Sequence, residues 1–186
     1  MPFAFPEGLA PEVYPLAWLV GTWSGSGVID HPAVGRRAFT QELTFDHDGG
    51  PYLRFESTLR VGSAEPVTDP AADGEAAAGP AESVWSTETG YWRVSTDRPD
   101  GLGEDRHPLE VIVADAAGRM TLFLGAAGNG RIDLASDAIA RTSTSSDVRA
   151  SKRMYGLVDG RLLWVEELAA FGEPLRSYAS GELDRR

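Results

Sequence analysis

Cysteine is absent from this chain of 186 residues. Disulfides, thiolate catalysis and cysteine-based metal sites are therefore excluded. Cations are also scarce, because 17 lysine and arginine residues stand against 28 acidic ones and the formal net charge is -11. Since binding to phosphate groups needs clustered positive charge, this balance argues against nucleic acid and against an anionic membrane surface as partners.

Long apolar runs are missing as well. No stretch approaches the roughly 18 apolar residues that a membrane-spanning helix needs. The first residues carry neither the basic segment nor the apolar core of a secretory signal. We therefore expect a cytoplasmic protein without membrane insertion.

Histidine is rare, with three in the chain, and each lies beside turn residues. No two of His31, His47 and His107 have the spacing of a zinc site, so we expect no bound metal. His31 closely follows the first predicted strand and could face the mouth of a barrel. It could equally be a turn residue that packs on Pro32.

Helical periodicity is confined to one short segment, over residues 11–20. Alternating apolar and polar residues then predict ten strands, separated by turn signals such as Asp159-Gly160. These strands cover residues 21–30, 37–46, 51–60, 83–96, 108–114, 119–126, 130–138, 148–158, 161–171 and 174–184. Short strands joined by tight turns form a meander, and closure removes its exposed edges. We therefore expect an all-β fold, a ten-stranded antiparallel up-and-down β-barrel with a short N-terminal helical segment.

Residues 62–82 differ from the rest of the chain. They are rich in alanine, glycine, proline and acidic residues and hold almost no large apolar side chain. Such a segment buries too little surface to order itself. We expect a single domain over residues 1–186 with a disordered loop at 62–82.

The first predicted strand has an unusual face. Gly21, Trp23, Gly25 and Gly27 share one side of it, so that face is bare except for one indole ring. A bare face lets a ligand or another backbone come close. The pattern therefore suits either a ligand-holding barrel or a strongly bent strand with a buried tryptophan.

The segment over residues 87–93 combines polar and aromatic side chains on a predicted strand. Thr87, Thr89, Tyr91 and Arg93 share one face, and Glu88, Gly90 and Trp92 share the other. Either face could line the interior, and the sequence does not decide between them.

Three segments resemble the nitrobindin family, whose barrels are similar to those of fatty-acid-binding proteins and lipocalins. They are Gly21–Gly27 with the turn that follows it, Thr87–Val94, and Gly172–Tyr178. The resemblance runs from about Leu16 to Leu183, interrupted by the insertion at 62–82. It implies a ten-stranded barrel whose end holds ferric haem through one axial histidine on the last strand. It also implies binding of nitric oxide and isomerisation of peroxynitrite.

Tyr178 stands at the position of that axial histidine, and His31 replaces the family's tyrosine after the first strand. A tyrosine phenolate can ligate ferric iron, as it does in catalase. An ordinary phenol has a pKa near ~10, so ligation would need help from a cation such as Arg176 or Arg153.

We expect the loss of the histidine to remove haem. The function expected is a non-enzymatic protein that holds a small hydrophobic or amphipathic molecule, with no cofactor and no catalytic residue. The alternative is a ferric haem protein that isomerises peroxynitrite with Tyr178 or His31 as the axial ligand. Outward apolar positions such as Leu162 and Leu163 would permit a homodimer. The predicted ligand-binding residues are Trp23, His31, Phe39, Phe55, Trp92, Met154, Trp164 and Tyr178.

Overall fold

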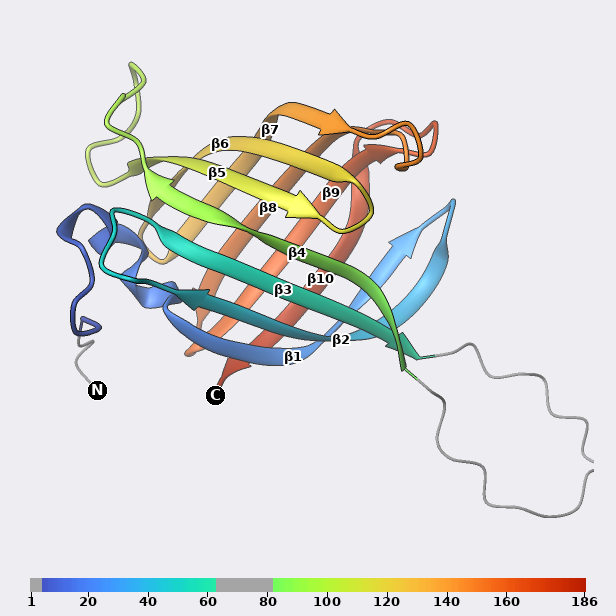
Figure 1. Cartoon of the computed structure of the whole chain (residues 1–186), viewed down its shortest axis with the longest axis horizontal. Helices are drawn as coiled ribbons and strands as arrows, with labels where there is room; N and C mark the ends of the chain where they lie inside the picture. The colour runs from blue at the N-terminus through green and yellow to red at the C-terminus, as the bar shows by residue number, and fades with distance from the viewer. Residues whose placement is uncertain (1–4, 63–81) are drawn as a thin grey trace, which may run out of the picture.

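The computed structural model describes residues 5–62 and 82–186 (Figure 1). Its elements are a 3₁₀ helix η1 (Pro11–Leu19) and the strands β1 (Gly21–His31), β2 (Gly35–Asp46), β3 (Leu53–Gly62), β4 (Glu82–Val94), β5 (His107–Asp115), β6 (Arg119–Gly128), β7 (Arg131–Arg141), β8 (Val148–Val158), β9 (Arg161–Ala170) and β10 (Arg176–Arg185). The loop predicted over 62–82 lies outside the described residues, except for its two ends, which belong to β3 and β4.

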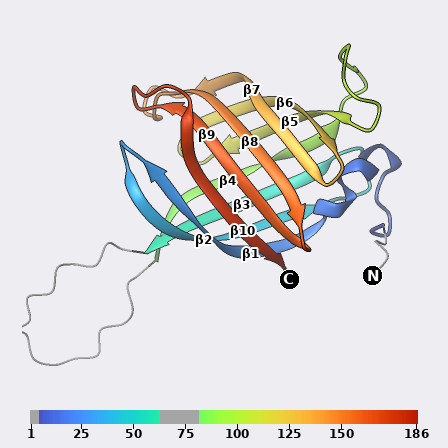
Figure 2. The same ribbon diagram turned by 180° about the vertical axis from the view of Figure 1, so that it is seen from behind.

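The strands form one closed antiparallel barrel. Each strand pairs with its neighbours in sequence, and β1 pairs with β10 to complete the wall. Figure 2 shows β8, β9 and β10 closing the side that is hidden in Figure 1. The predicted all-β, ten-stranded up-and-down barrel is therefore confirmed, with strand ends within a few residues of those expected.

The glycines of β1 allow it to lie close to β10. A Cβ atom at Gly25 would meet the backbone carbonyl of Glu182, and one at Gly27 would meet the carbonyl of Ser180 and the ring of Phe39. Both glycines lie in register with β10 where the barrel closes. The bare face is thus occupied by backbone and by one neighbouring ring.

Trp23 belongs to the packed core. Its side chain is fully buried, and its Nε1 donates a hydrogen bond to the carbonyl of Leu19 at 2.7 Å. The guanidinium of Arg185 lies 4.2 Å from the centre of the indole ring, within cation–π range. The strand therefore has the structural role that the sequence offered as one of two interpretations.

Helix η1 closes one end of the barrel. Its buried face presents Val13, Leu16 and Leu19, and the helix contacts β4 and β6. Deeper in the barrel, Trp92 packs edge-to-face on Phe45, with ring centres 5.1 Å apart. This end is filled with apolar side chains, so open space is left at the other end. In the described part of the chain, no helix is both long enough and apolar enough to cross a membrane.

Candidate ligand cavity in the barrel

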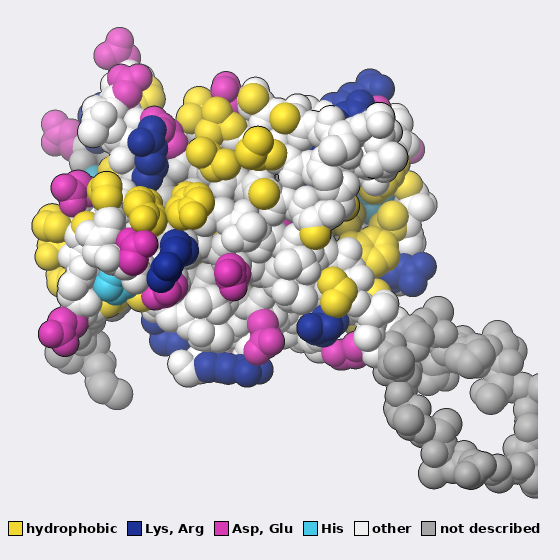
Figure 3. All heavy atoms as spheres, viewed as in Figure 1, with side chains coloured by type: hydrophobic (Ala, Val, Ile, Leu, Met, Phe, Trp, Pro, Cys, Tyr) yellow, Lys and Arg dark blue, Asp and Glu magenta, His cyan; other side chains and the backbone are white. Residues whose placement is uncertain are grey.

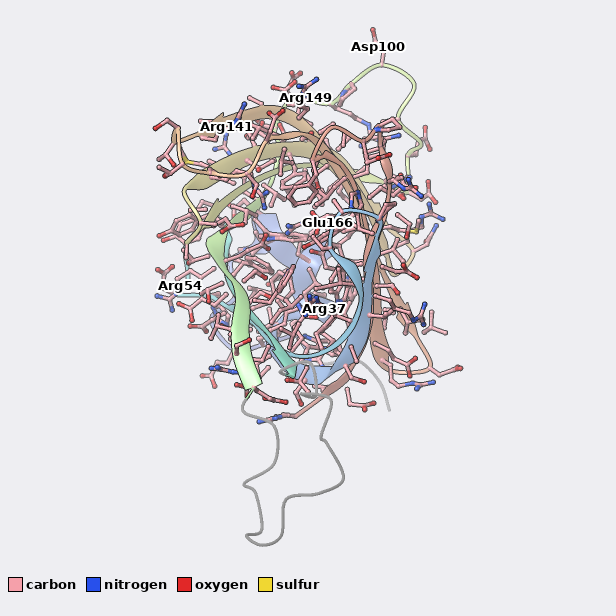
Figure 4. The ribbon with its side chains drawn as sticks, turned by 90° about the vertical axis from the view of Figure 1, so that its right-hand side faces the viewer. Arg37, Arg54, Asp100, Arg141, Arg149 and Glu166 are labelled. Carbon is pink, nitrogen blue, oxygen red and sulfur yellow. The ribbon has the colours of Figure 1, made fainter. Side chains whose placement is uncertain are left out.

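A cavity of about 180 Å³ lies inside the end of the barrel away from η1. Its mouth is formed by turn residues that include Ala117, Ser145 and Phe171. Figure 4 looks into this end. The apolar part of the wall includes Leu43, Phe55, Leu59, Trp164 and Leu168, and the polar part includes Gln41, Ser57, Glu88, Asp115, Arg119, Arg153 and Glu166.

The centre of the polar wall is Arg153, which extends inward from β8. Its two terminal nitrogens donate to the two oxygens of Glu88 at 2.7 and 2.5 Å, and its Nε donates to Glu166 Oε1 at 2.9 Å. Ser151 Oγ donates to the same oxygen of Glu166 at 2.8 Å. These bonds join β4, β8 and β9 across the barrel.

The ion pairs set the charge states of the wall. Burial alone would raise the pKa of Glu88, but the charge of Arg153 and its hydrogen bonds outweigh burial and hold this pKa below its ordinary value. Burial alone would lower the pKa of Arg153, but Glu166 and Glu88 raise it well above its ordinary value. Glu88 and Arg153 therefore form an ionised pair inside the barrel.

A second ion pair lies nearer the mouth. Arg119 donates to Asp115 Oδ2 at 2.8 Å, and the backbone N–H of Ala117 donates to Asp115 Oδ1 at 2.6 Å. The side chains of Arg119 and Asp115 are 16% and 10% exposed. Both oxygens of Asp115 are therefore bonded, and Arg119 is neutralised locally.

Tyr178 enters the cavity from an irregularity in β10. The register with β9 shifts between Ser177 and Ala179, and such a bulge re-aims the side chain at that point. The indole N–H of Trp85 donates to the Tyr178 oxygen at 2.9 Å. Burial raises the pKa of Tyr178 from its ordinary value, and the Trp85 bond offsets only part of that rise. Tyr178 is therefore a neutral phenol whose oxygen already accepts one hydrogen bond.

His31 lies behind Tyr178 and is 1% exposed. Its ring centre is 6.0 Å from that of Tyr178 and 5.5 Å from that of Phe171, both in edge-to-face geometry. Its Nδ1 accepts a hydrogen bond from the backbone N–H of Ala33 at 3.2 Å. Its Nε2 is buried without a hydrogen-bond partner among the described residues.

Three of the predicted ligand-binding residues line the cavity, namely Phe55, Trp164 and Tyr178. Trp164 is fixed by a hydrogen bond from its Nε1 to Gln41 at 2.7 Å, and Gln41 in turn donates to Ser57 at 2.9 Å. Two strands thus hold the indole in one orientation.

The other predicted residues lie elsewhere. Trp23 and Trp92 are in the apolar core, and Phe39 packs against Trp164 with ring centres 5.9 Å apart. His31 is not part of the cavity wall. Met154 was expected inside the barrel, and this expectation is wrong, because its side chain is 37% exposed on the outer face of β8. The neighbouring Arg153 points inward instead.

The cluster of charged side chains in the wall is not among the predicted ligand-binding residues. The parity of residues 87–93 is now decided, since Trp92 is fully buried whereas Tyr91 is 54% exposed. Glu88 shares the inward face with Trp92, and this shared strand parity is the feature of the sequence that indicates an inward-pointing Glu88. Arg176, expected as a possible aid to Tyr178, is instead exposed and paired with Glu173.

Comparisons with known proteins agree with the barrel fold. A family model described as a THAP4-like, heme-binding beta-barrel domain matches residues 12–185. A ferric nitrobindin-like protein of Beutenbergia cavernae is 42% identical over 100% of this chain and 99% of its own length. A peroxynitrite isomerase of Clavibacter sepedonicus is 35% identical over 96% of each chain. The crystal structure of Rv2717c from M. tuberculosis has the same fold, with a TM-score of 0.71 at 24% identity, covering 96% of this chain and 99% of that one.

These matches correct two expectations. A non-enzymatic carrier of a hydrophobic molecule and the absence of a cofactor were both inferred from the replacement of the axial histidine by Tyr178. The family model describes a haem-binding barrel, and a relative that matches nearly the whole chain is named peroxynitrite isomerase, so both inferences are wrong and the haem alternative is favoured. The resemblance to nitrobindins is confirmed, and the chain belongs to the THAP4-like, haem-binding β-barrel family.

Proposed function

We propose that this protein binds ferric haem at the cavity end of the barrel and isomerises peroxynitrite. The haem-binding family model and the relative named peroxynitrite isomerase support this proposal. The observation that carries it is the oxygen of Tyr178, which comes from the last strand into the cavity wall and already accepts a hydrogen bond from Trp85.

The donor atoms in the cavity fit ferric iron. A tyrosine oxygen ligates ferric haem in catalase. The N–H of Trp85 donates to this oxygen, and such a bond strengthens when the oxygen becomes anionic. Because burial raises the pKa of Tyr178, its Oη keeps the proton until a cation takes the proton's place. A bound metal ion is such a cation.

His31 fits the role of ligand less well. Its Nδ1 accepts a hydrogen bond from Ala33, which places the proton of the neutral imidazole on Nε2. A protonated Nε2 has no free electron pair for iron. We therefore assign ligation to Tyr178 and not to His31.

The enclosed space sets a condition on binding. Pockets for drug-sized ligands have about 300–1,000 Å³, whereas this cavity has about 180 Å³. Side chains at the mouth must therefore move outward to admit a porphyrin. The mouth is built from turns such as those of Ala117, Ser145 and Phe171, and turns are more mobile than paired strands.

The chain's own residues would then act in three ways. Tyr178 would hold the group in place, Phe55 and Leu59 would exclude bulk water, and the ion pair of Arg153 with Glu88 would keep the floor of the cavity rigid. Ferric haem, when bound, supplies a Lewis-acidic centre that polarises the substrate.

Titration with hemin tests the proposal. The wild-type protein should form a one-to-one complex with a shifted Soret band, and Tyr178→Phe should weaken binding at least about tenfold because it removes the ligand oxygen. Tyr91→Phe is the matched control, because Tyr91 is 54% exposed on the outer face of β4. An unchanged hemin spectrum with wild-type protein would refute haem binding, and loss of binding only in His31→Ala would refute the ligand assignment. The loaded protein should also speed the decay of peroxynitrite to nitrate in stopped-flow measurements.

Two further expectations remain proposals. A homodimer would use the outer face, where Ile112, Met120 and Leu124 are each about half exposed and hydrophobic side chains gather over β5 and β6 (Figure 3). Leu162 is fully buried and cannot take part. Light scattering of wild-type protein and Ile112→Glu tests the dimer.

The cytoplasmic location is tested by cell fractionation.

A further inference from the structure

Five charged side chains share the wall of the cavity. Arg119 and Arg153 supply guanidinium groups, and Glu88, Asp115 and Glu166 supply carboxylates. Each side chain is between 7% and 16% exposed. The formal charges leave one negative charge in excess, in a region where water screens poorly.

Glu166 is the carboxylate with an acceptor to spare. Both oxygens of Glu88 receive hydrogen bonds from Arg153, and both oxygens of Asp115 are bonded. Arg153 and Ser151 donate to Oε1 of Glu166. Among the described residues no group donates to its Oε2. In Figure 4 the labelled Glu166 lies within the ring of strands.

The charge and the free acceptor discriminate between small ligands. A small anion that enters the cavity meets an excess of negative charge, and the two guanidinium groups are already paired with carboxylates. A neutral molecule with an O–H or N–H group meets an acceptor that lines the cavity and has no donor among the described residues. Leaving such an acceptor unbonded is unfavourable, so a donor is preferred.

We propose that the cavity admits small neutral hydrogen-bond donors in preference to small anions, and that Oε2 of Glu166 accepts their hydrogen bond. For the substrate, this inference rests on the proposed function. The cavity then admits peroxynitrous acid, whose O–H donates to Glu166, and not the peroxynitrite anion. Glu166 is thus a specificity-determining residue. The groups facing it are Glu88 of β4, Asp115 of β5, Arg119 of β6, Arg153 of β8 and Tyr178 of β10.

The preference can be measured on the haem-free protein with two probes of similar shape. Nitrate and urea are both planar and trigonal, but nitrate is an anion without donors and urea is a neutral donor. The side-chain N–H signal of Arg153, followed by NMR, reports on occupancy because this nitrogen bonds to Glu166. Both probes are titrated at millimolar concentrations, and urea should bind at least about tenfold more tightly than nitrate.

A variant and its control complete the test. Glu166→Gln removes the excess negative charge, so nitrate binding should tighten about tenfold and urea binding should weaken. Glu167→Gln makes the same change in net charge on the outward-facing neighbour and should leave both affinities unchanged. Nitrate binding as tight as urea binding in the wild type, or no binding of urea, overturns the inference. If Glu166→Gln does not fold, the wild-type ratio alone decides. The hemin titration tests haem binding separately, so the two failures are distinguishable.

Discussion

The two ends of this barrel are built in opposite ways on the same strands. The end near η1 is filled by apolar side chains, with Trp23, Phe45 and Trp92 fully buried. The other end carries two guanidinium groups and three carboxylates around an open cavity. Apolar side chains pack until the space between them is filled, whereas the charged side chains are held in fixed positions by their hydrogen bonds and leave a cavity beside them.

We expect this division to separate stability from ligand binding. Burial of apolar area is the main source of folding free energy, so the end near η1 should carry most of the stability. Buried ion pairs contribute little net stability, because desolvation offsets their attraction. Removing one partner of a pair is a different matter, because it leaves a buried charge unpaired. Substitutions at the two ends should therefore destabilise the protein by different mechanisms as well as by different amounts.

The largest expected effect is at the apolar end. Trp92→Ala should lower the free energy of unfolding by about 4 kcal/mol, because it removes a buried indole that contacts Phe45, Phe55 and Tyr155. Urea denaturation followed by circular dichroism measures this change. Trp85→Ala at the mouth is the control and should lower stability much less, because Trp85 is only partly buried. Equal losses in the two variants would contradict the proposed division.

The next effect is at the charged end. Arg153→Met should lower the free energy of unfolding by about 3 kcal/mol at neutral pH, because Glu88 and Glu166 then lose their buried partner. Arg153 holds the pKa of Glu88 below its ordinary value of 4.5, so the stabilisation is complete above that value and is lost as the pH falls through the lowered pKa.

In Arg153→Met the pKa of Glu88 should instead be raised by burial, because its cationic partner is gone. The stability difference from the wild type should therefore shrink as the pH is lowered from neutral. Adding Glu88→Gln and Glu166→Gln to Arg153→Met should recover much of the loss at neutral pH. A loss that does not depend on pH would show that Arg153 matters through packing alone.

The sequence predicts the two ends of the barrel unequally, because apolar packing follows a local pattern and charge pairing does not. Alternation and turn signals predict the barrel because they are local, and the apolar end obeys the rule that hydrophobic residues point inward. That rule fails at Arg153 and Met154, where the charged residue is inside and the apolar one is outside. Arg153 is tolerated inside because Glu88, which is 65 positions away in the chain, bonds to it. Such long-range pairing leaves no trace in the local pattern.

Tyr178 stands out in the sequence through the resemblance to a family and not through periodicity. The sequence shows that a tyrosine replaces a histidine, but not that Trp85 donates to its oxygen, because those residues are 93 positions apart. The substitution by itself suggests the loss of haem, because the contact with Trp85 is visible only in the structure. The surroundings of the replaced side chain are therefore as informative as its identity.

A smaller effect on stability is expected at Tyr178. Tyr178→Phe should lower the free energy of unfolding by about 1 kcal/mol, because the Trp85 N–H loses its acceptor while the ring remains. Hemin binding by the same variant should fall at least about tenfold, because the ligand oxygen is removed. Thermal unfolding without hemin, together with hemin titration, measures the two quantities on one sample. A large loss of stability would place Tyr178 with the core of the barrel and weaken its assignment as a ligand.

The smallest effect is expected where the same kind of pair lies on the surface. Arg36 donates to Asp30 at 2.9 Å, but these side chains are 71% and 58% exposed. Arg36→Met should change the free energy of unfolding by less than about 1 kcal/mol, because water already solvates both charges. The change is the same in type as Arg153→Met, so urea denaturation of the two variants isolates the effect of burial. If both variants lost the same stability, the loss would follow from removing any arginine and not from burial. That result would contradict the contrast between the two ends of the barrel.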